Sequence, residues 1–276
     1  MWIPRPAEDV AREVFPAEQL STAENERDFT DARALAGEMF EGICPVCGSR
    51  AYFTRFNDNL RESGICSICG STNRNRQLAS LVRRRYGMPA QGAFKFPAEF
   101  AIYNAESSGP LHERLKAQPR YVCSEYWGPD FRPGEIVKGI RHEDLQRLSF
   151  DENSIDLVLS SDVLEHMPDP YRAHEEIFRV LKSGGRHIFT VPFVVGWETD
   201  EIRARVVDGA VVYIKEKIYH GDPIRPQEGV LVWTIFGMEM LNKLTEQGFE
   251  CGMWIVHEPS RGILGRNNSI FEAKKP

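Results

Sequence analysis

From residue 98 onward, apolar and polar residues alternate with two different periodicities along the chain. Short apolar runs bounded by turn residues predict strands, and apolar residues at every third or fourth position predict helices. Seven strands are expected, at 100–104, 121–125, 135–139, 155–160, 186–192, 252–257 and 269–273. Strands that alternate with helices are typical of an α/β fold with a mostly parallel sheet and helices on both faces.

Two of the expected helices have a clear apolar face. The stretch "DPYRAHEEIFRVLKSGG" places Ala173 and Val180 on the same side, with Asp169 as N-cap and Gly184 as the glycine that ends the helix. The stretch "MEMLNKLTEQG" buries its methionines and leucines and ends at Gly248.

The N-terminal third has a different organisation. Residues 1–41 mix charge with scattered apolar positions and are expected to form one or two short helices. Residues 42–72 are alternating stretches broken by glycine, which predicts a small β module. Residues 73–97 contain a helix with its arginines outward and then a linker rich in Gly and Pro. The main domain spans 98–276, and an insertion at 196–232 interrupts its rhythm.

The small β module contains two CxxC pairs. They are formed by Cys44, Cys47, Cys66 and Cys69. This spacing predicts a zinc ribbon, and four thiolates close a tetrahedron, so the zinc is expected to be structural and to supply folding energy. Redox activity of the pairs, or disulfides, are the alternatives. The two other cysteines, Cys123 and Cys251, lie among apolar residues and are expected to be small buried side chains.

Composition narrows the possible partners. The 276 residues include 42% hydrophobic and 27% charged residues, and the formal net charge is −6. This is an ordinary globular composition, and the net charge does not favour binding to nucleic acid. The N-terminus lacks the apolar core of a signal peptide, and no apolar run reaches the roughly 18–20 residues of a membrane span. A cytoplasmic protein without membrane contact is expected, and a homodimer is compatible with the sequence.

One long stretch resembles a known family. Residues 148–193, "LSFDENSIDLVLSSDVLEHMPDPYRAHEEIFRVLKSGGRHIFTVPF", join an acidic turn, a strand, a polar loop, a helix and another strand. The whole run resembles class I S-adenosylmethionine (SAM)-dependent methyltransferases of the type 11 group, and the resemblance covers roughly residues 98–276. The ribbon, with "CSICGSTNRNRQL", is similar to a bacterial subgroup that joins a four-cysteine module to this domain. The resemblance implies a Rossmann-like sheet and SAM as the cofactor.

The chain departs from this family in the loop after the first strand, "IYNAESSGPLHERL". The family has an acid and two glycines there, whereas this chain has Asn104, Glu106 and Ser108. SAM has no pyrophosphate to cradle, so its loop needs glycine less than a dinucleotide site does. The resemblance still implies cofactor contacts from Asn104, Ala105, Glu106 and Gly109.

Further cofactor positions follow the later strands. The resemblance places Glu125 on both ribose hydroxyls, and Asp144 with Leu145 on the adenine edge. Ser160 and Ser161 end the fourth strand, where open α/β sheets bind ligands. The alternative interpretations are a surface acid at Glu125 and a helix N-cap at Asp144.

Three residues are candidates for handling the acceptor's proton. Methyl transfer from a sulfonium is an in-line displacement, and a hydroxyl acceptor also needs a base, for which imidazole is suited. His166 in "LEHMPDP" follows the fourth strand, and His220 with Asp222 in "HGDP" lies in the insertion, where the resemblance implies an acceptor pocket. Alternatively, His166 only orients its loop and "HGDP" is only a turn.

These features favour a SAM-dependent methyltransferase that acts on the oxygen or nitrogen of a small molecule or of a sugar in a glycan or natural product. Two alternatives stay open. An RNA-modifying methyltransferase would dock RNA through the ribbon and the following arginines. A non-catalytic scaffold subunit would keep the fold and bind no cofactor, as the glycine-poor loop allows.

Overall fold

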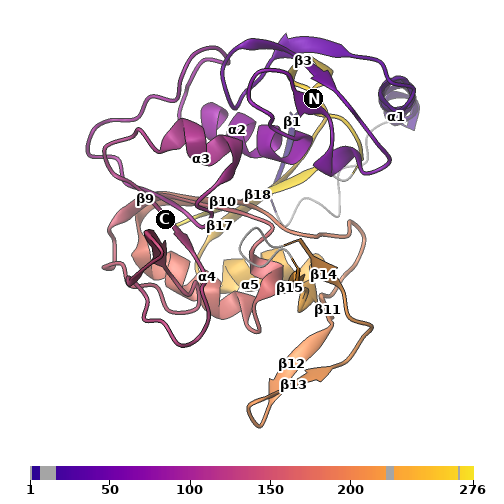
Figure 1. Cartoon of the computed structure of the whole chain (residues 1–276). Helices are drawn as coiled ribbons and strands as arrows, with labels where there is room; N and C mark the ends of the chain where they lie inside the picture. Colours follow the sequence, from indigo (N-terminus) through magenta and orange to yellow (C-terminus); the bar gives the residue numbers. More distant parts are fainter. Residues whose placement is uncertain (1, 7–16, 222–226, 267) are drawn as a thin grey trace.

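A nine-stranded sheet forms the centre of the computed structural model, which describes residues 2–6, 17–221, 227–266 and 268–276 (Figure 1). In spatial order the strands are β1 (Trp2–Pro6), β17 (Glu250–Val256), β18 (Ser269–Lys274), β10 (Leu181–Thr190), β9 (Ile155–Ser161), β5 (Ile102–Asn104), β6 (Tyr121–Glu125), β8 (Ile140–His142) and β7 (Ile136–Val137). Strands β1, β18 and β7 run antiparallel to their neighbours, and the other six run in one direction. The expected mostly parallel, Rossmann-like sheet is therefore confirmed.

The order of the strands creates one favoured place for a ligand. From β5 the chain goes first to β6 on one side and later to β9 and β10 on the other. At such a switch point the connections diverge and leave a crevice at the carboxyl ends of the strands. The carboxyl ends of β5, β6 and β9 meet at this crevice.

Helices cover both faces of the sheet, as Figure 1 shows. α2 (Asn73–Arg85) and α3 (Gly109–Leu115) lie on one face, and α4 (Pro170–Val180) and α5 (Glu239–Glu246) on the other. Strand β9 is apolar on both sides because it is buried between these layers. Leu157 and Leu159 join the core under α2 and α3, and Val158 joins the core under α4 and α5.

Two expected element positions differ from the structure. α4 ends at Val180 rather than near Gly184, because Leu181 is already extended and pairs with Ile155 of β9. Gly184, at φ +78°, instead lies in the irregular part of β10 and donates its N–H to Lys275. The third parallel strand is β8, and the expected strand at 135–139 supplies only its short antiparallel partner β7. The expected end of α5 at Gly248 is confirmed by a φ of +101° one residue after its C-cap.

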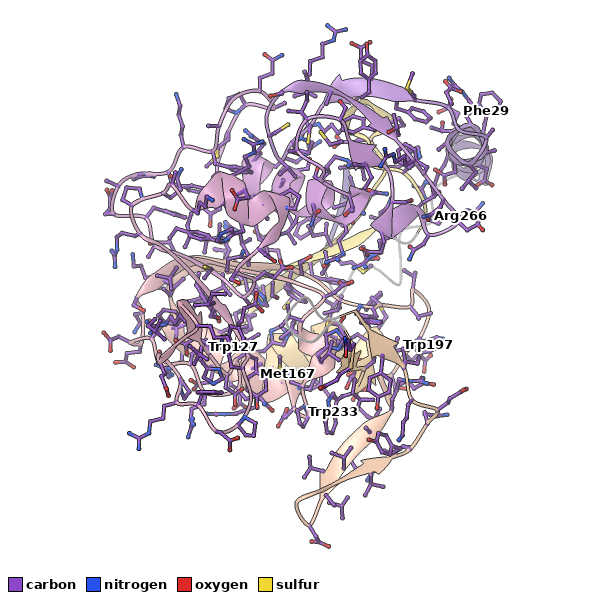
Figure 2. All side chains as sticks on the ribbon, in the orientation of Figure 1. Phe29, Trp127, Met167, Trp197, Trp233 and Arg266 are labelled. Carbon is purple, nitrogen blue, oxygen red and sulfur yellow. The ribbon has the colours of Figure 1, made fainter. Side chains whose placement is uncertain are left out.

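The N-terminal segment forms one long helix, α1 (Ala17–Leu35), rather than short ones, and β1 adds an edge strand to the main sheet. Arg266 lies beside α1 (Figure 2) and its guanidinium binds the carboxylate of Asp28 at 2.6 Å. Asp31 of the same helix accepts the N–H of Gly265 at 2.9 Å. These contacts join α1 to the C-terminal part of the sheet. No helix in the described part of the chain has the length and apolar character that a membrane span requires.

The four-cysteine module is a three-stranded sheet made of β2 (Phe40–Ile43), β3 (Arg50–Thr54) and β4 (Ile65–Cys66), with a 3-10 turn η1 (Leu60–Glu62) before β4. It shares a hydrophobic core with the main sheet. Phe53 of β3 and Val46 pack in the same cluster as Leu157 of β9.

The expectation that the arginines of α2 face solvent is wrong for Arg76 and Arg83, whereas Arg84 and Arg85 are exposed. Arg76 and Arg83 are fully buried, and carbonyl oxygens of the ribbon, the linker and the η3 turn (Pro259–Arg261) accept their N–H groups. Arg84 and Arg85 pair with Glu258 and Glu272 of the main domain. Arg76 and Arg83 are therefore not accessible to RNA, and only the other arginines of the helix could serve the RNA-docking alternative.

The insertion forms three pairs of short strands. They are β11 (Glu201–Ile202) with β16 (Thr234–Ile235), β12 (Ala204–Val207) with β13 (Ala210–Tyr213), and β14 (Tyr219–His220) with β15 (Val230–Leu231). The β12–β13 hairpin projects away from the rest of the molecule (Figure 1). The β14–β15 pair brings His220 to the crevice at the carboxyl edge of the sheet.

Candidate active site

A cavity of about 950 Å³ lies at the carboxyl ends of β5, β6 and β9. Its lining comes from distant parts of the chain. Residues of η1 and α2, of the loops after the parallel strands, and of the insertion all contribute to it. Eight of the expected site residues line it. They are Ala105, Glu106, Glu125, Asp144, Leu145, Ser161, His166 and His220.

The glycine-poor loop after β5 is held by side chains instead of by tight backbone turns. The N–H and the hydroxyl of Ser107 both donate to Glu125 Oε1 at 2.8 Å. Asn104 is buried and donates to the carbonyl of Glu106 at 2.8 Å and to the hydroxyl of Tyr121 at 3.0 Å. Asn104 therefore shapes the loop and does not itself line the cavity.

Glu125, the expected ribose contact, lines the cavity. It is the last residue of β6, and its carboxylate faces the cavity with Oε1 fixed by Ser107. A carboxylate oriented in this way has a second oxygen available for a ligand hydroxyl. Asp144 and Leu145 line the same end of the cavity, and Asp144 also accepts the N–H of Gln146 at 2.9 Å.

Two other expected cofactor residues do not line the cavity. Ser160 is buried in β9, and its hydroxyl lies 2.9 Å from Nε2 of His187, inside the sheet. Gly109 begins α3 at φ +88°, and its neighbour Ser108 lines the cavity instead. Strand pleating explains Ser160, because only alternate residues at the end of β9 face the crevice.

Side chains of the ribbon form a charged wall that the sequence did not predict. Arg61 of η1 binds both carboxylate oxygens of Asp162 at 2.6 Å. Arg74 of α2 binds Glu62 at 2.8 Å and lies 3.6 Å from Asp162. Burial raises the pKa of Asp162, but the two arginines outweigh that effect and hold the pKa well below its ordinary value. Asp162 is thus a carboxylate, and its backbone is left-handed at φ +54°.

Glu106 is the carboxyl group most affected by its surroundings on the cofactor side. Burial raises its pKa to about 7, and the carboxylates of Asp162, Glu125 and Glu165 add to this, while Arg74 opposes it. A glutamate of this kind changes charge near neutral pH, next to the place where the resemblance implies the positively charged end of SAM.

A second polar group at the cavity is formed by Glu165, His166 and His220. We call it the Glu165–His166–His220 cluster. Glu165 and His166 belong to the 3-10 turn η2 (Leu164–His166), directly after β9, and His220 comes from β14 of the insertion. Both imidazoles line the cavity, whereas Glu165 lies fully buried behind them.

The members of this cluster alter one another's ionisation. Burial raises the pKa of Glu165 to about 7, Asp162 raises it further, and His220 opposes the shift. Contact with Glu165 in turn raises the pKa of His220. The carboxylate that orients His220 in the described residues is therefore Glu165, which we did not single out from the sequence. The expected partner Asp222 lies outside the described residues.

The tryptophans of the insertion are not part of the cavity wall. Figure 2 marks Trp197 and Trp233 near the insertion, and neither lines the cavity, although Met167 does. Trp233 is buried, and its backbone N–H donates to the backbone carbonyl of Glu165 at 2.7 Å, which helps to hold η2 in place.

The four cysteines converge in the ribbon as expected. Their sulfur atoms all lie within 4.8 Å of one another, and Cys44 Sγ is 3.8 Å from Cys69 Sγ. In a tetrahedral zinc site with Zn–S bonds of about 2.3 Å, neighbouring sulfurs lie about 3.8 Å apart. The hydroxyl of Ser71 lies 3.4 Å from Cys44 and 3.3 Å from Cys69, so it can donate to a thiolate. The donor set fits zinc.

Part of the chain is similar to known proteins. Residues 109–189, from α3 to the end of β10, match a family model described as a methyltransferase domain. The chain contains a methyltransferase domain. An uncharacterized methyltransferase of Mycobacterium tuberculosis is 42% identical over 136 residues, which is 48% of this chain and 52% of that protein. Another, from Mycobacteroides abscessus, is 44% identical over 45 residues, or 16% of this chain and 17% of that protein.

The chain thus spans about half the length of the M. tuberculosis relative and under a fifth of the M. abscessus one. Among solved structures, the YcgJ protein from Bacillus subtilis covers 73% of this chain and 99% of its own at 12% identity and a TM-score of 0.41. A SAM-dependent methyltransferase from Methanosarcina mazei covers 65% and 94% at 16% identity and a TM-score of 0.38. The cavity-lining residues Glu125, Asp144 and His166 lie within the stretch that matches the family model.

Proposed function

We propose that this chain is a SAM-dependent methyltransferase whose cofactor binds at the Glu125 end of the cavity. The observation that carries the proposal is the position of Glu125, at the tip of β6 and facing a cavity inside the methyltransferase domain. Its free oxygen would accept the ribose hydroxyls, and Asp144 with Leu145 would receive the adenine. Glu106 would face the cationic end of SAM.

The remaining part of the cavity would hold the acceptor. It extends toward His166 and His220, and the insertion closes it on that side. Methyl transfer needs the nucleophile, the methyl carbon and the sulfur in line, which a cavity of this shape supplies by orienting both ligands. The acceptor atom would be an oxygen or nitrogen of a small molecule or of a glycan or natural-product sugar.

Calorimetry with SAM tests the proposal directly. Wild-type protein is expected to bind SAM, and Glu125→Ala is expected to bind at least tenfold more weakly because the ribose loses its main acceptor. Glu113→Ala is the matched control, since Glu113 is an exposed glutamate of α3. Absence of binding by the wild type would contradict the proposal and favour the scaffold alternative.

We propose further that the four ribbon cysteines hold one structural zinc ion. The short Cys44–Cys69 distance and the buried Ser71 hydroxyl support this. One zinc per chain is expected by elemental analysis, and Cys69→Ser is expected to lose it. Purified protein that contains no zinc and still has four reactive thiols would contradict the assignment.

A further inference from the structure

The Glu165–His166–His220 cluster has the dimensions of one face of a metal coordination sphere. His220 Nδ1 lies 3.3 Å from His166 Nε2, and each nitrogen lies 3.5 Å from Glu165 Oε1. With metal–ligand bonds of about 2.1 Å, neighbouring ligand atoms lie about 3.0 Å apart in an octahedral site and about 3.4 Å apart in a tetrahedral one. The triangle formed by these three atoms matches that range.

The hydrogen bonds around the cluster orient its donors inward. His166 Nδ1 lies 2.9 Å from the backbone carbonyl of Leu231, which can only accept, so Nδ1 carries the proton and Nε2 keeps its lone pair toward the cluster. A second nitrogen fixed in this way is the usual arrangement of a metal-binding histidine.

The carboxylate of Glu165 is buried, and its nearest possible cations are the imidazoles of His166 and His220, each 3.5 Å away. Both of its carboxylate oxygens are buried and neither has a hydrogen-bond donor among the described residues. The nearby cations Arg61 and Arg74 are already engaged by Asp162 and Glu62. A buried carboxylate without a donor is costly, and a bound cation would offset that cost.

We propose that Glu165, His166 and His220 form a binding site for a divalent first-row transition-metal ion at the acceptor end of the cavity. The donor set of two imidazoles and one carboxylate suits Zn²⁺, Fe²⁺ or Mn²⁺ better than Mg²⁺ or Ca²⁺, which prefer oxygen ligands. Because the two histidines face the cavity while Glu165 lies behind them, the remaining coordination positions are directed toward the acceptor.

The site would bind the acceptor through a hydroxyl group, and this role rests on the proposed methyl transfer. The ion lowers the pKa of a coordinated hydroxyl, so the proton passes to solvent. The oxygen then attacks the methyl carbon of SAM. A C–O bond forms while the C–S bond breaks, and the sulfur keeps the electron pair as a neutral thioether. Metal binding itself does not depend on this reaction.

Electron paramagnetic resonance of Mn²⁺ tests the site in the full chain, because Mn²⁺ has little affinity for the thiolates of the ribbon. One Mn²⁺ per chain is expected for the wild type. His166→Ala, His220→Ala and Glu165→Gln are each expected to weaken binding at least tenfold. His112→Ala removes an imidazole of α3 that does not line the cavity, and binding is expected to be unchanged. Co²⁺ followed by visible absorption is the second probe.

The outcomes separate the site from the proposed function. His220 is a partly exposed side chain of a short hairpin, so its variant is expected to fold, and thermal unfolding checks this. If the wild type binds neither Mn²⁺ nor Co²⁺ outside the ribbon, or if all variants bind equally, the inference is overturned. SAM binding without metal binding would leave the proposed function standing, and metal binding without SAM binding would leave only the metal site.

Discussion

Glu106 stands where the family resemblance implies a glycine, and its side chain changes charge near neutral pH. With a pKa raised to about 7 by burial, it is neutral below that pH and negative above it. Only the carboxylate attracts the cationic end of SAM. We therefore predict that SAM affinity, measured by calorimetry, increases several-fold between pH 6 and pH 8.

The matched variant for this prediction is Glu106→Gln, which keeps the size of the side chain and removes the charge. Its SAM affinity is expected to be lower at pH 8 and to change little with pH, apart from any titration of SAM itself. A pH profile identical to that of the wild type would show that Glu106 does not face the cofactor.

His220 is expected to act on the acceptor and not on the cofactor, because the proposed ribose and adenine contacts come from Glu125 and Asp144, whereas His220 belongs to the insertion. His220→Ala is predicted to keep SAM affinity within a factor of two and to lower turnover at least tenfold. Steady-state kinetics together with calorimetry measure the two quantities separately. An unchanged turnover would remove His220 from the mechanism.

The sequence allowed some site residues to be predicted and not others, and the difference is physical. Four thiolates with fixed spacing, or an acid at the end of a strand, are local features, so Cys44 and Glu125 could be found. Arg61 reaches Asp162 across 101 positions of the chain, and no local pattern encodes that contact. Glu165 was missed although it precedes His166, since only the fold reveals that its carboxylate is buried.

The ribbon contributes to the cavity through a single short element, η1. Its Arg61 and the buried Asp162 form a pair whose side chains are only 16% and 14% exposed. Without Arg61, the remaining cation beside Asp162 among the described residues is Arg74 at 3.6 Å, so much of the charge compensation is lost. Arg61→Met is predicted to lower the free energy of unfolding by about 3 kcal/mol, measured by urea denaturation.

A double-mutant cycle with Asp162→Asn distinguishes this pair from general loss of packing. The double variant is expected to be more stable than the sum of the single losses predicts, because no charge is then left alone. The exposed pair Arg50–Glu41 on the β2–β3 hairpin is the control, and its coupling is expected to be below about 0.5 kcal/mol. Equal coupling in both pairs would contradict a structural role for Arg61.

Element positions were predictable where the apolar periodicity is strong, as in β9 and α5. The predictions failed at boundaries decided by long-range pairing, such as the end of α4, where Leu181 joins β9. The prediction that the arginines of α2 face solvent failed for Arg76 and Arg83, because a run of arginines is typical of a solvent-exposed helix face. In the structure the stems and guanidinium groups of Arg76 and Arg83 fill space between the ribbon and the sheet.

The whole molecule is expected to lose stability in mild acid because two histidines are buried in its core. Burial lowers the pKa of His174 to about 3, and that of His187 also lies well below its ordinary value. Both are neutral when folded, whereas the unfolded chain binds protons below about pH 6.5. Their stabilisation is complete above that pH and decreases as the pH falls, by about 2 kcal/mol for His174 between pH 7.5 and pH 5.

Thermal unfolding of His174→Phe checks this prediction. Among the described residues, neither ring nitrogen of His174 has a hydrogen-bond partner, and the ring packs on Phe189 and Phe249. The phenyl ring is therefore expected to raise the melting temperature, and more at pH 5 than at pH 7.5. His187→Phe is the contrast: it removes the partner of Ser160 and is expected to destabilise at both pH values. Equal gains at both pH values for His174→Phe would contradict the argument.

The interface between the ribbon and the main domain is tightly packed at two glycines. A side-chain carbon at Gly42 would lie 1.7 Å from the carbonyl oxygen of Ser260, and one at Gly262 would lie 2.4 Å from the ring of Phe53. Replacing this ribbon with one that carries a larger residue at the position of Gly42 would therefore cause a steric clash with the main domain. A ribbon from another protein would have to leave space at both glycines, so exchange of either segment alone is expected to disrupt their contact.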